Sequence, residues 1–302
     1  MASLREIRRK IKSVKSTEQI TKAMKMVAAA RMRRSQLSIL AARPFAIKME
    51  RLVRELALLE IRAEQAAGLP LDIHPFFNRR PQSGAELIVF VTGDKGLCGA
   101  FNSNVLRAAI DWFRARKGRK SYCVVVGRKG RDFVHRLKGA DVEVIQELAG
   151  VFPKVSFAHA ELVGQAVIDA YLDPTKSVSK VTVLYNEFKS VAQQRLLTVA
   201  LLPIPEPEVV PAEIALPDYG FEPGRQELLG ALLPRHVKAS LYRILLESQA
   251  AELAARMNAM DAASKNAKEL REALNLDANR TRQSFITKEI AELVGGAEAL
   301  AN

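Results

Sequence analysis

Proline and glycine are distributed so unevenly along this chain that they divide it into three parts. Pro44 is the only proline or glycine before Gly68, and residues 235–294 contain neither, whereas residues 68–234 are rich in both. Because proline and glycine interrupt helices, the two ends are predicted to be long helices. The sequence therefore predicts an N-terminal helix over residues 1–67, an α/β domain over residues 83–215 and a C-terminal helix over residues 224–302.

Both terminal helices have an apolar seam typical of a coiled coil. A capping box, Ser3 with Glu6, begins the first helix. Its seam is Leu4, Ile7, Ile11, Val14, Ile20, Met24 and Val27. Thr17 lies three residues from both Val14 and Ile20, and this shortened heptad predicts local overwinding. The seam of the last helix is Val237, Leu241, Ile244, Ser248, Ala251, Ala255, Met260, Ala263, Ala267, Leu270 and Leu274. Gly295 and Gly296 are expected to end that helix.

The length of the last helix determines how it must be packed. A helix over residues 235–294 is about 90 Å long, whereas a compact globule of this chain length is only about 50 Å across. The helix must therefore extend beyond the middle domain, and the N-terminal helix is the natural partner for its seam. The sequence predicts an antiparallel coiled coil of the two terminal helices with a domain inserted between them.

The segment ITKAMKMVAAARMRRSQ, residues 20–36, carries methionines on different sides of its helix. Met24 and Met26 are two residues apart and point to nearly opposite sides, so only one can face the partner helix. We expect Met26 and Met32 to contact another protein, because they would otherwise be exposed to water.

The same region is strongly basic. Residues 1–36 carry eleven Lys or Arg against Glu6 and Glu18, and the whole chain has a net charge of +13. A solvated helix face, a nucleic-acid-binding region and a contact with an acidic protein surface all fit this charge. The apolar seam runs through the basic stretch, and no aromatic residues interleave for base stacking. Only the acidic protein surface also explains Met26 and Met32.

The middle part alternates between strand and helix patterns. AELIVFV, SYCVVV, KVTVLYNEF and RLLTVALLPI are typical of strands, and AHAELVGQAVIDAYL is typical of a helix. This alternation predicts a Rossmann-like α/β sheet. The loop Gly93–Gly99 invites comparison with nucleotide-binding loops, but it is neither a Walker loop nor a G-x-G-x-x-G fingerprint. A tight strand-to-helix turn is the favoured interpretation, and a nucleotide- or dinucleotide-binding enzyme using this loop is the alternative.

No constellation in the sequence predicts catalysis or metal binding. The four histidines are scattered without metal-ligand spacing, and no nucleophile elbow is present. Cys98 and Cys123 form no CxxC motif and are expected to be buried, reduced thiols. No secretory signal or membrane-spanning stretch is recognised. The expectation is a chain with no catalytic residues, no metal and no cofactor of its own.

Four segments together resemble the gamma subunit of F-type ATP synthases. They are residues 20–36, TGDKGLCGAFNSNV (Thr92–Val105), ARMNAMDAASKNAKEL (Ala255–Leu270) and NRTRQSFITKEIAELVGGAEAL (Asn279–Leu300). The likeness covers nearly the whole chain in order, although residues 140–215 match only in outline. It implies the rotor of a central stalk that couples rotation of a proton-driven c-ring to ATP synthesis or hydrolysis at the beta subunits.

The resemblance also implies partners, a location and contact residues. The partners are a hexameric ring of alpha and beta subunits, the epsilon subunit and the c-ring, with one copy of this chain per complex. The location is the cytoplasmic face of a bacterial plasma membrane, as a peripheral protein. The implied contacts with beta are Met24, Lys25, Arg34, Arg282, Gln283 and Thr287. An apolar bearing of Ile290, Leu293 and Val294 and a contact of Tyr219 and Glu222 with epsilon or the c-ring complete the set.

Overall fold

A computed structural model gives the fold of the chain except at a few positions. It describes all residues apart from 1–2, 69–72, 79, 82–83, 138–140, 153, 206–219, 221, 223 and 302, and for 295–301 it describes the backbone only. The chain divides into two compact units. We call Met1–Ala29 with Arg256–Asn302 the coiled-coil unit, and Ala30–Ala255 the sheet unit.

The two terminal helices are as long as their lack of proline and glycine predicts. Helix α1 covers Leu4–Ala67, and helix α5 covers Arg225–Ala301. Each helix contains one proline, Pro44 in α1 and Pro234 in α5, without being interrupted in the described residues. The expected end of α5 at Gly295 and Gly296 is wrong, because the helix continues to Ala301. Glycine lowers helix stability by only about 1 kcal/mol, so a glycine pair does not have to end a helix.

The sheet unit is built on five strands in the order β3-β2-β1-β4-β5. The strands are β1 (Ala85–Val91), β2 (Ser121–Val126), β3 (Val142–Leu148), β4 (Val178–Phe188) and β5 (Gln194–Leu202). Strand β1 pairs in parallel with β2 and β4, β2 pairs in parallel with β3, and β5 is antiparallel to β4. The predicted α/β sheet is thus confirmed. Strand β3 was not predicted, because its sequence VEVIQEL contains three polar residues.

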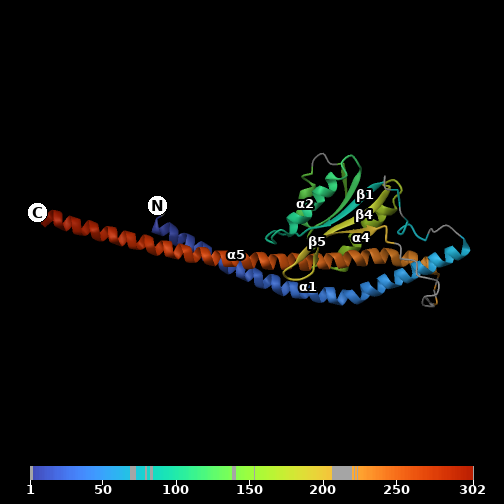
Figure 1. Cartoon of the computed structure of the whole chain (residues 1–302), viewed down its shortest axis with the longest axis horizontal. Coiled ribbons are helices and arrows are strands. Elements are labelled where there is room, and N and C mark those ends of the chain that lie inside the picture. The colour runs from blue at the N-terminus through green and yellow to red at the C-terminus, as the bar shows by residue number, and fades with distance from the viewer. Residues whose placement is uncertain are drawn as a thin grey trace. The chain divides into compact units, whose positions relative to one another are not determined.

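Helices cover both faces of this sheet. One face packs against α2 (Phe101–Arg114) and α3 (Arg128–Val134), with Phe90, Cys123 and Trp112 in the core between them. The other face packs against α4 (Phe157–Leu172) and the parts of α1 and α5 in this unit. Figure 1 shows α2 and α5 on opposite sides of the sheet. Because helices cover both faces, the central strands β1 and β2 are buried along nearly their whole length.

The coiled-coil unit is an antiparallel pair. Lys25 of α1 contacts Asp261 of α5, and Glu18 contacts Arg271, so residue numbers fall along one helix as they rise along the other. The predicted capping box is present at the start of α1. The Ser3 N–H donates to Glu6 Oε2 at 3.1 Å, and the Glu6 N–H donates to Ser3 Oγ at 3.3 Å.

The seam of α1 differs from the prediction after Val14. Met24, a predicted seam residue, and Ala29 are half-buried beside the seam. The buried and half-buried positions that follow the heptad are Leu4, Ile7, Ile11, Val14, Glu18, Thr21, Lys25 and Ala28. These positions alternate steps of four and three residues, so the heptad continues and the predicted shortened heptad is wrong. Ile20 and Val27 are 56% and 51% exposed and lie outside the seam. Hydrophobicity alone would place Ile20 and Val27 in the seam. The uninterrupted heptad instead places Glu18 and Lys25 there, and α5 supplies an opposite charge to each.

The seam of α5 shows the same effect. In the coiled-coil unit its buried and half-buried heptad positions are Met260, Ser264, Ala267, Arg271, Leu274, Ala278 and Thr281. The predicted seam residue Leu270 is instead 52% exposed, and Arg271 takes its place beside Glu18. In the sheet unit the predicted residues Val237, Leu241, Ile244, Ser248 and Ala251 are all buried.

Candidate functional site

The C-terminal part of α5 is a helix without a covering partner in its own unit. Every side chain described from Arg282 to Val294 is exposed. In Figure 1 this part of α5 continues past the N-terminus of α1. It contains the predicted polar contacts Arg282, Gln283 and Thr287 and the predicted bearing, which begins at Ile290. The structure therefore leaves all these predicted contact side chains accessible to another molecule.

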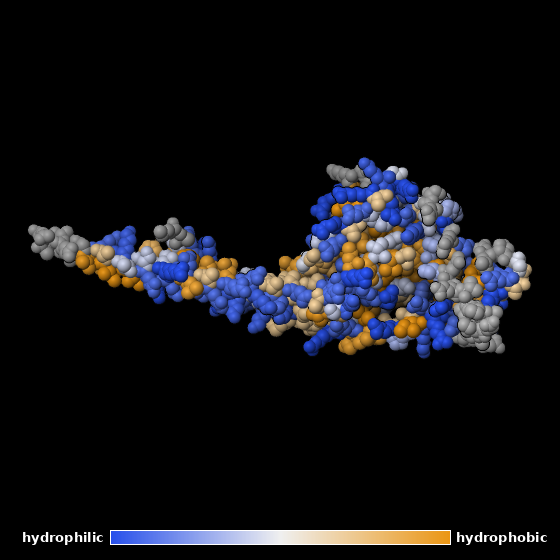
Figure 2. Space-filling view, in the orientation of Figure 1, coloured by the Kyte–Doolittle hydropathy of each residue, from blue (hydrophilic) through white to orange (hydrophobic). Residues whose placement is uncertain are grey.

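Apolar side chains gather on the same stretch. The large ones that are about half exposed or more are Phe285, Ile286, Ile290, Leu293 and Val294. At about 100° per residue, they spread over about half of the helix circumference. Figure 2 shows apolar atoms at this end of the coiled-coil unit. Exposed apolar surface of this extent marks a protein interaction site.

Lys25, another predicted contact, is engaged within the chain. Its Nζ lies 2.6 Å from Asp261 Oδ1. The hydrogen bond from Lys25, followed by that from Lys265, holds the pKa of Asp261 below its usual value. Met24 beside it is half-buried in the coiled-coil unit. Lys25 therefore contributes to holding α1 and α5 together, whatever else it contacts.

The two methionines expected to face outward have different environments. Met26 is 60% exposed, as expected, but Met32 is only 6% exposed. The expectation for Met32 is wrong, because the uninterrupted heptad brings it to an inward position of α1. Arg34, two residues further on, is exposed and remains accessible.

The loop after β1 is organised by its own carboxylate. Asp94 is 7% exposed, and its side chain accepts hydrogen bonds from the backbone N–H groups of Arg128, Gly150 and Phe152 at 2.8–2.9 Å. The Arg128 N–H belongs to the first turn of α3, and the N-terminus of a helix favours negative charge. Asp94 therefore takes the position of an anion at this helix N-terminus.

The first residue of this loop also packs against the chain itself, whereas residues 95–97 and 99 are exposed. The Gly93 N–H donates to Asn102 Oδ1 at 2.8 Å, and a side chain at Gly93 would lie 3.1 Å from Glu252 Oε1 of α5. Cys98, Phe101 and Ala251 form a small core beside it. These contacts lie at the carboxyl end of β1, on the edge of the sheet where ligands bind in open α/β folds. They argue against the nucleotide-binding interpretation of Gly93–Gly99.

The turn after β2 requires glycine most strictly. Gly127 has a φ of +95°, and a Cβ there would lie 2.0 Å from the Thr92 carbonyl oxygen. The Thr92 hydroxyl accepts a hydrogen bond from the Gly130 N–H at 2.8 Å. Close backbone packing was expected within Gly93–Gly99, but the closest approach is in this neighbouring turn.

Both cysteine side chains are buried, as predicted. Cys98 is 2% exposed and Cys123 is 0% exposed. Burial raises the pKa of the Cys123 thiol to about 12, so this thiol is protonated at neutral pH. A protonated, buried thiol is a poor nucleophile.

The histidines have structural contacts. His159 Nδ1 accepts a hydrogen bond from the Ser156 N–H at the start of α4. His135 contacts Glu147, and burial lowers the pKa of His236. Within the described part of the chain, no group of His, Cys, Asp and Glu residues has a metal-binding arrangement.

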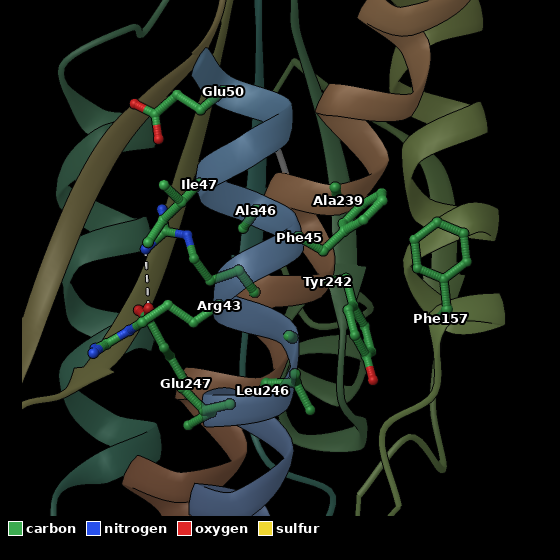
Figure 3. A pocket seen from close by; sticks show the side chains of 13 residues that line it. Arg43, Phe45, Ala46, Ile47, Glu50, Phe157, Ala239, Tyr242, Leu246 and Glu247 are labelled. Carbon is green, nitrogen blue, oxygen red and sulfur yellow. Dashed lines mark hydrogen bonds and ion pairs between the residues drawn. The ribbon is translucent and has the colours of Figure 1, made fainter. Parts of the chain in front are cut away.

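An apolar pocket of about 490 Å³ lies in the sheet unit between α1, α4 and α5. Figure 3 shows that the aromatic rings of Phe45, Tyr242 and Phe157 lie on one side of it. Glu247 lies on the other side, where it pairs with Arg243 and accepts a hydrogen bond from the Tyr185 hydroxyl. Burial and the neighbouring Glu247 raise the pKa of Tyr185.

The predicted contact in the middle part is only partly visible. Glu222 is exposed just before α5, whereas Tyr219 lies outside the described residues. Among the helices that the structure describes, none has a segment both long and apolar enough to cross a membrane.

Comparisons with known proteins agree on one family. A family model described as ATP synthase matches residues 3–300. The ATP synthase gamma chain of Elusimicrobium minutum (strain Pei191) is 43% identical over 305 residues, which cover 99% of both chains. That of Anaeromyxobacter sp. (strain K) is 42% identical over 302 residues, 99% of this chain and all of that one.

Solved structures show the same fold. A chain from the OSCP/F1/c-ring structure of Euglena gracilis mitochondrial ATP synthase has a TM-score of 0.66 at 18% identity, covering 98% of this chain and 94% of its own length. A chain of the central stalk and c-ring of the Tetrahymena thermophila mitochondrial enzyme has a TM-score of 0.57 at 25% identity, covering 81% and 99%.

Proposed function

This chain belongs to the gamma chains of the ATP synthase family, and we propose that it is the rotor of the central stalk of an F-type enzyme. The observation that supports this most strongly is the end of α5, where exposed apolar and polar side chains lie on a helix without a covering partner in its unit. Exposed apolar surface on a helix favours contact with another surface. A surrounding ring of subunits would provide such a surface.

The contacts fall into three groups. Arg282, Gln283 and Thr287, with Met24, Lys25 and Arg34 of α1, bind the beta subunits. Ile290, Leu293 and Val294 form an apolar bearing inside the ring. Glu222 and Tyr219 contact epsilon or the c-ring.

The proposed chemistry belongs to the partner subunits. This chain transmits rotation of the c-ring to the nucleotide sites of beta, and proton flow drives that rotation. One copy serves each complex, at the cytoplasmic face of a bacterial plasma membrane. The hydrogen bonds that Gly93 and Asp94 make within the chain support a mechanical role and not a nucleotide site of its own.

Reconstitution with alpha and beta subunits tests the proposal. We expect Arg282→Ala to lower the ATPase turnover of the complex by about thirtyfold, which corresponds to the loss of about 2 kcal/mol at the rate-limiting stage. Truncating one partner of a buried charged pair costs about 2–5 kcal/mol, so this magnitude is reasonable. Lys268→Ala is the matched control, because Lys268 is exposed on α5 and pairs only loosely with Glu272.

Two results would overturn the proposal. The first is failure of the unmodified chain to form a complex with alpha and beta. The second is equal turnover for Arg282→Ala and Lys268→Ala in complexes of matched composition, which would remove the role of Arg282.

A further inference from the structure

A small polar cavity lies between the two helices of the coiled-coil unit, near the N-terminus of α1. Its volume is about 260 Å³. Leu4, Ile11 and Ala278 line it at seam positions, and Arg8 of α1 and Arg282 of α5 line it from positions beside the seam. Two arginines from different helices therefore share one cavity.

The position of these arginines in the heptad is unusual. Arg8 follows the seam residue Ile7, and Arg282 follows the seam residue Thr281. Positions beside a coiled-coil seam commonly carry opposite charges that pair between the helices. Here both are positive, and like charges held around one cavity repel each other.

Elsewhere in the same unit, charges that meet between the helices are matched. Glu18 faces Arg271, and Lys25 faces Asp261. The lining of the cavity includes no acidic residue, and no ion pair of Arg8 or Arg282 is found in the described part of the chain. The two positive charges at this cavity therefore lack the opposite charge that the other interhelical charges of this unit have. A negative charge from outside the chain would supply it.

The remaining lining groups suit a carboxylate. Asn275 and Asn279 of α5 also line the cavity, and each side-chain amide has two N–H donors. Arginine presents a planar fork of donors that binds carboxylates in a bidentate manner. The cavity is smaller than the roughly 300–1,000 Å³ typical of small-molecule pockets, and no aromatic side chain lines it for stacking. These properties favour one acidic side chain on a protein loop over a nucleotide.

We propose that Arg8 and Arg282, one from each helix, together bind a single Asp or Glu side chain of a partner loop. This rests on the proposed function, because the partner is then a subunit of the surrounding ring that contacts Arg282. A carboxylate held by both helices would also resist sliding of α1 along α5, since sliding would separate the two guanidinium groups. A force that the partner exerts through this contact would therefore act on α1 and α5 together.

A double-mutant cycle in the reconstituted complex tests this proposal. ATPase turnover is measured for Arg8→Ala, Arg282→Ala and the double variant. We expect Arg8→Ala alone to lower turnover by about tenfold, and the double variant to be only about as slow as Arg282→Ala, because both changes remove one shared contact. Arg8→Lys should recover part of the loss, because it restores the charge without the fork.

Control variants separate this contact from general charge effects. Lys12→Ala and Arg280→Ala each remove an exposed cation from α1 or α5 without touching the cavity lining. Both are expected to keep turnover within about twofold of the unmodified chain. The helical circular dichroism of isolated Arg8→Ala should match the unmodified chain, because Arg8 is exposed and not part of the seam.

The outcomes distinguish this inference from the proposed function. A complex that forms and turns over, but in which the Arg8 and Arg282 effects multiply independently or Arg8→Ala has no effect, overturns the shared carboxylate while leaving the rotor role intact. Absence of any complex with the unmodified chain overturns the rotor role itself. Arg8-dependent binding of inorganic phosphate by the isolated chain, together with unaltered turnover of Arg8→Ala, would identify a simple anion site and also overturn the proposal.

Discussion

At the residue scale, Asp94 shows how one side chain connects three segments of the sheet unit. Its carboxylate accepts backbone N–H groups from the start of α3 and from the loop after β3. An unpaired buried donor costs about 1–3 kcal/mol, and of the three donors only the Phe152 N–H lies in a fully buried hydrogen bond, so Asp94→Ala should lower the free energy of unfolding of this unit by at least about 1 kcal/mol. Trp112 is the only tryptophan and lies in the same unit, so its fluorescence during urea unfolding measures the change.

Asp94→Asn should give an intermediate value, because the amide keeps one acceptor oxygen. Asp111→Ala provides the control. Asp111 is exposed and lies 3.9 Å from Arg114, so its removal should change the urea midpoint little. Identical midpoints for Asp94→Ala and Asp111→Ala would show that the three hydrogen bonds do not stabilise the fold.

At the scale of elements, the pairing of α1 with α5 relies on charges within the heptad. Lys25 holds the pKa of Asp261 below its ordinary value, so this ion pair favours the folded helix pair above the unfolded pKa of about 3.9. That contribution is lost only as the pH falls through the lower, folded pKa. Titration of Asp261 by carboxyl NMR should therefore show a depressed pKa in the unmodified chain and a higher one in Lys25→Met.

Lys268→Met is the matched control, because Lys268 lies near Glu272 and not near Asp261. If Asp261 titrates at the same pH in the unmodified chain and in Lys25→Met, the ion pair is absent in solution. In that case, the placement of Lys25 in the seam would need another explanation.

At the scale of the whole molecule, the exposed apolar end of α5 governs how the isolated chain behaves. Apolar surface exposed to water favours association. Replacing Ile290, Leu293 and Val294 together with glutamine should weaken self-association at least about tenfold, which corresponds to about 1.4 kcal/mol. Sedimentation velocity measures this change. The urea midpoint reported by Trp112 should stay constant, because this tryptophan belongs to the sheet unit and the substitutions to the coiled-coil unit.

A variant with Lys288→Gln and Glu292→Gln controls for changes in polarity on the same helix. These two residues form an exposed ion pair within α5. This double variant should self-associate as strongly as the unmodified chain. Equal association of all three proteins would show that the apolar end is not the surface through which the isolated chain associates.

The sequence alone determined the features that depend on local properties. The absence of proline and glycine predicted both long helices, and the pairing of Ser3 with Glu6 predicted the cap of α1. Runs rich in apolar and β-branched residues predicted four of the five strands. In β1 and β2 these runs are longest without interruption, because both faces of these strands are covered. Strand β3 could not be found this way, since its residues are only partly buried and include Glu143, Gln146 and Glu147. The contact residues on α5 came from resemblance to a family and not from any local pattern.

Only the tertiary structure decided the features that depend on a partner distant in sequence. Hydrophobicity assigns Ile20 and Val27 to the seam, but Glu18 and Lys25 occupy it because α5 brings an opposite charge to each. In the sequence, Asp94 is one acidic residue in a loop with no visible role. Its role follows from the N–H groups that α3 and the loop after β3 bring to it in the fold. In the sequence, Arg8 cannot be distinguished from the other basic residues of α1. The structure distinguishes it, because α5 places Arg282 at the same cavity. The energy of a charge or a hydrogen bond depends on the groups within a few ångströms of it. Only the folded structure determines which groups those are.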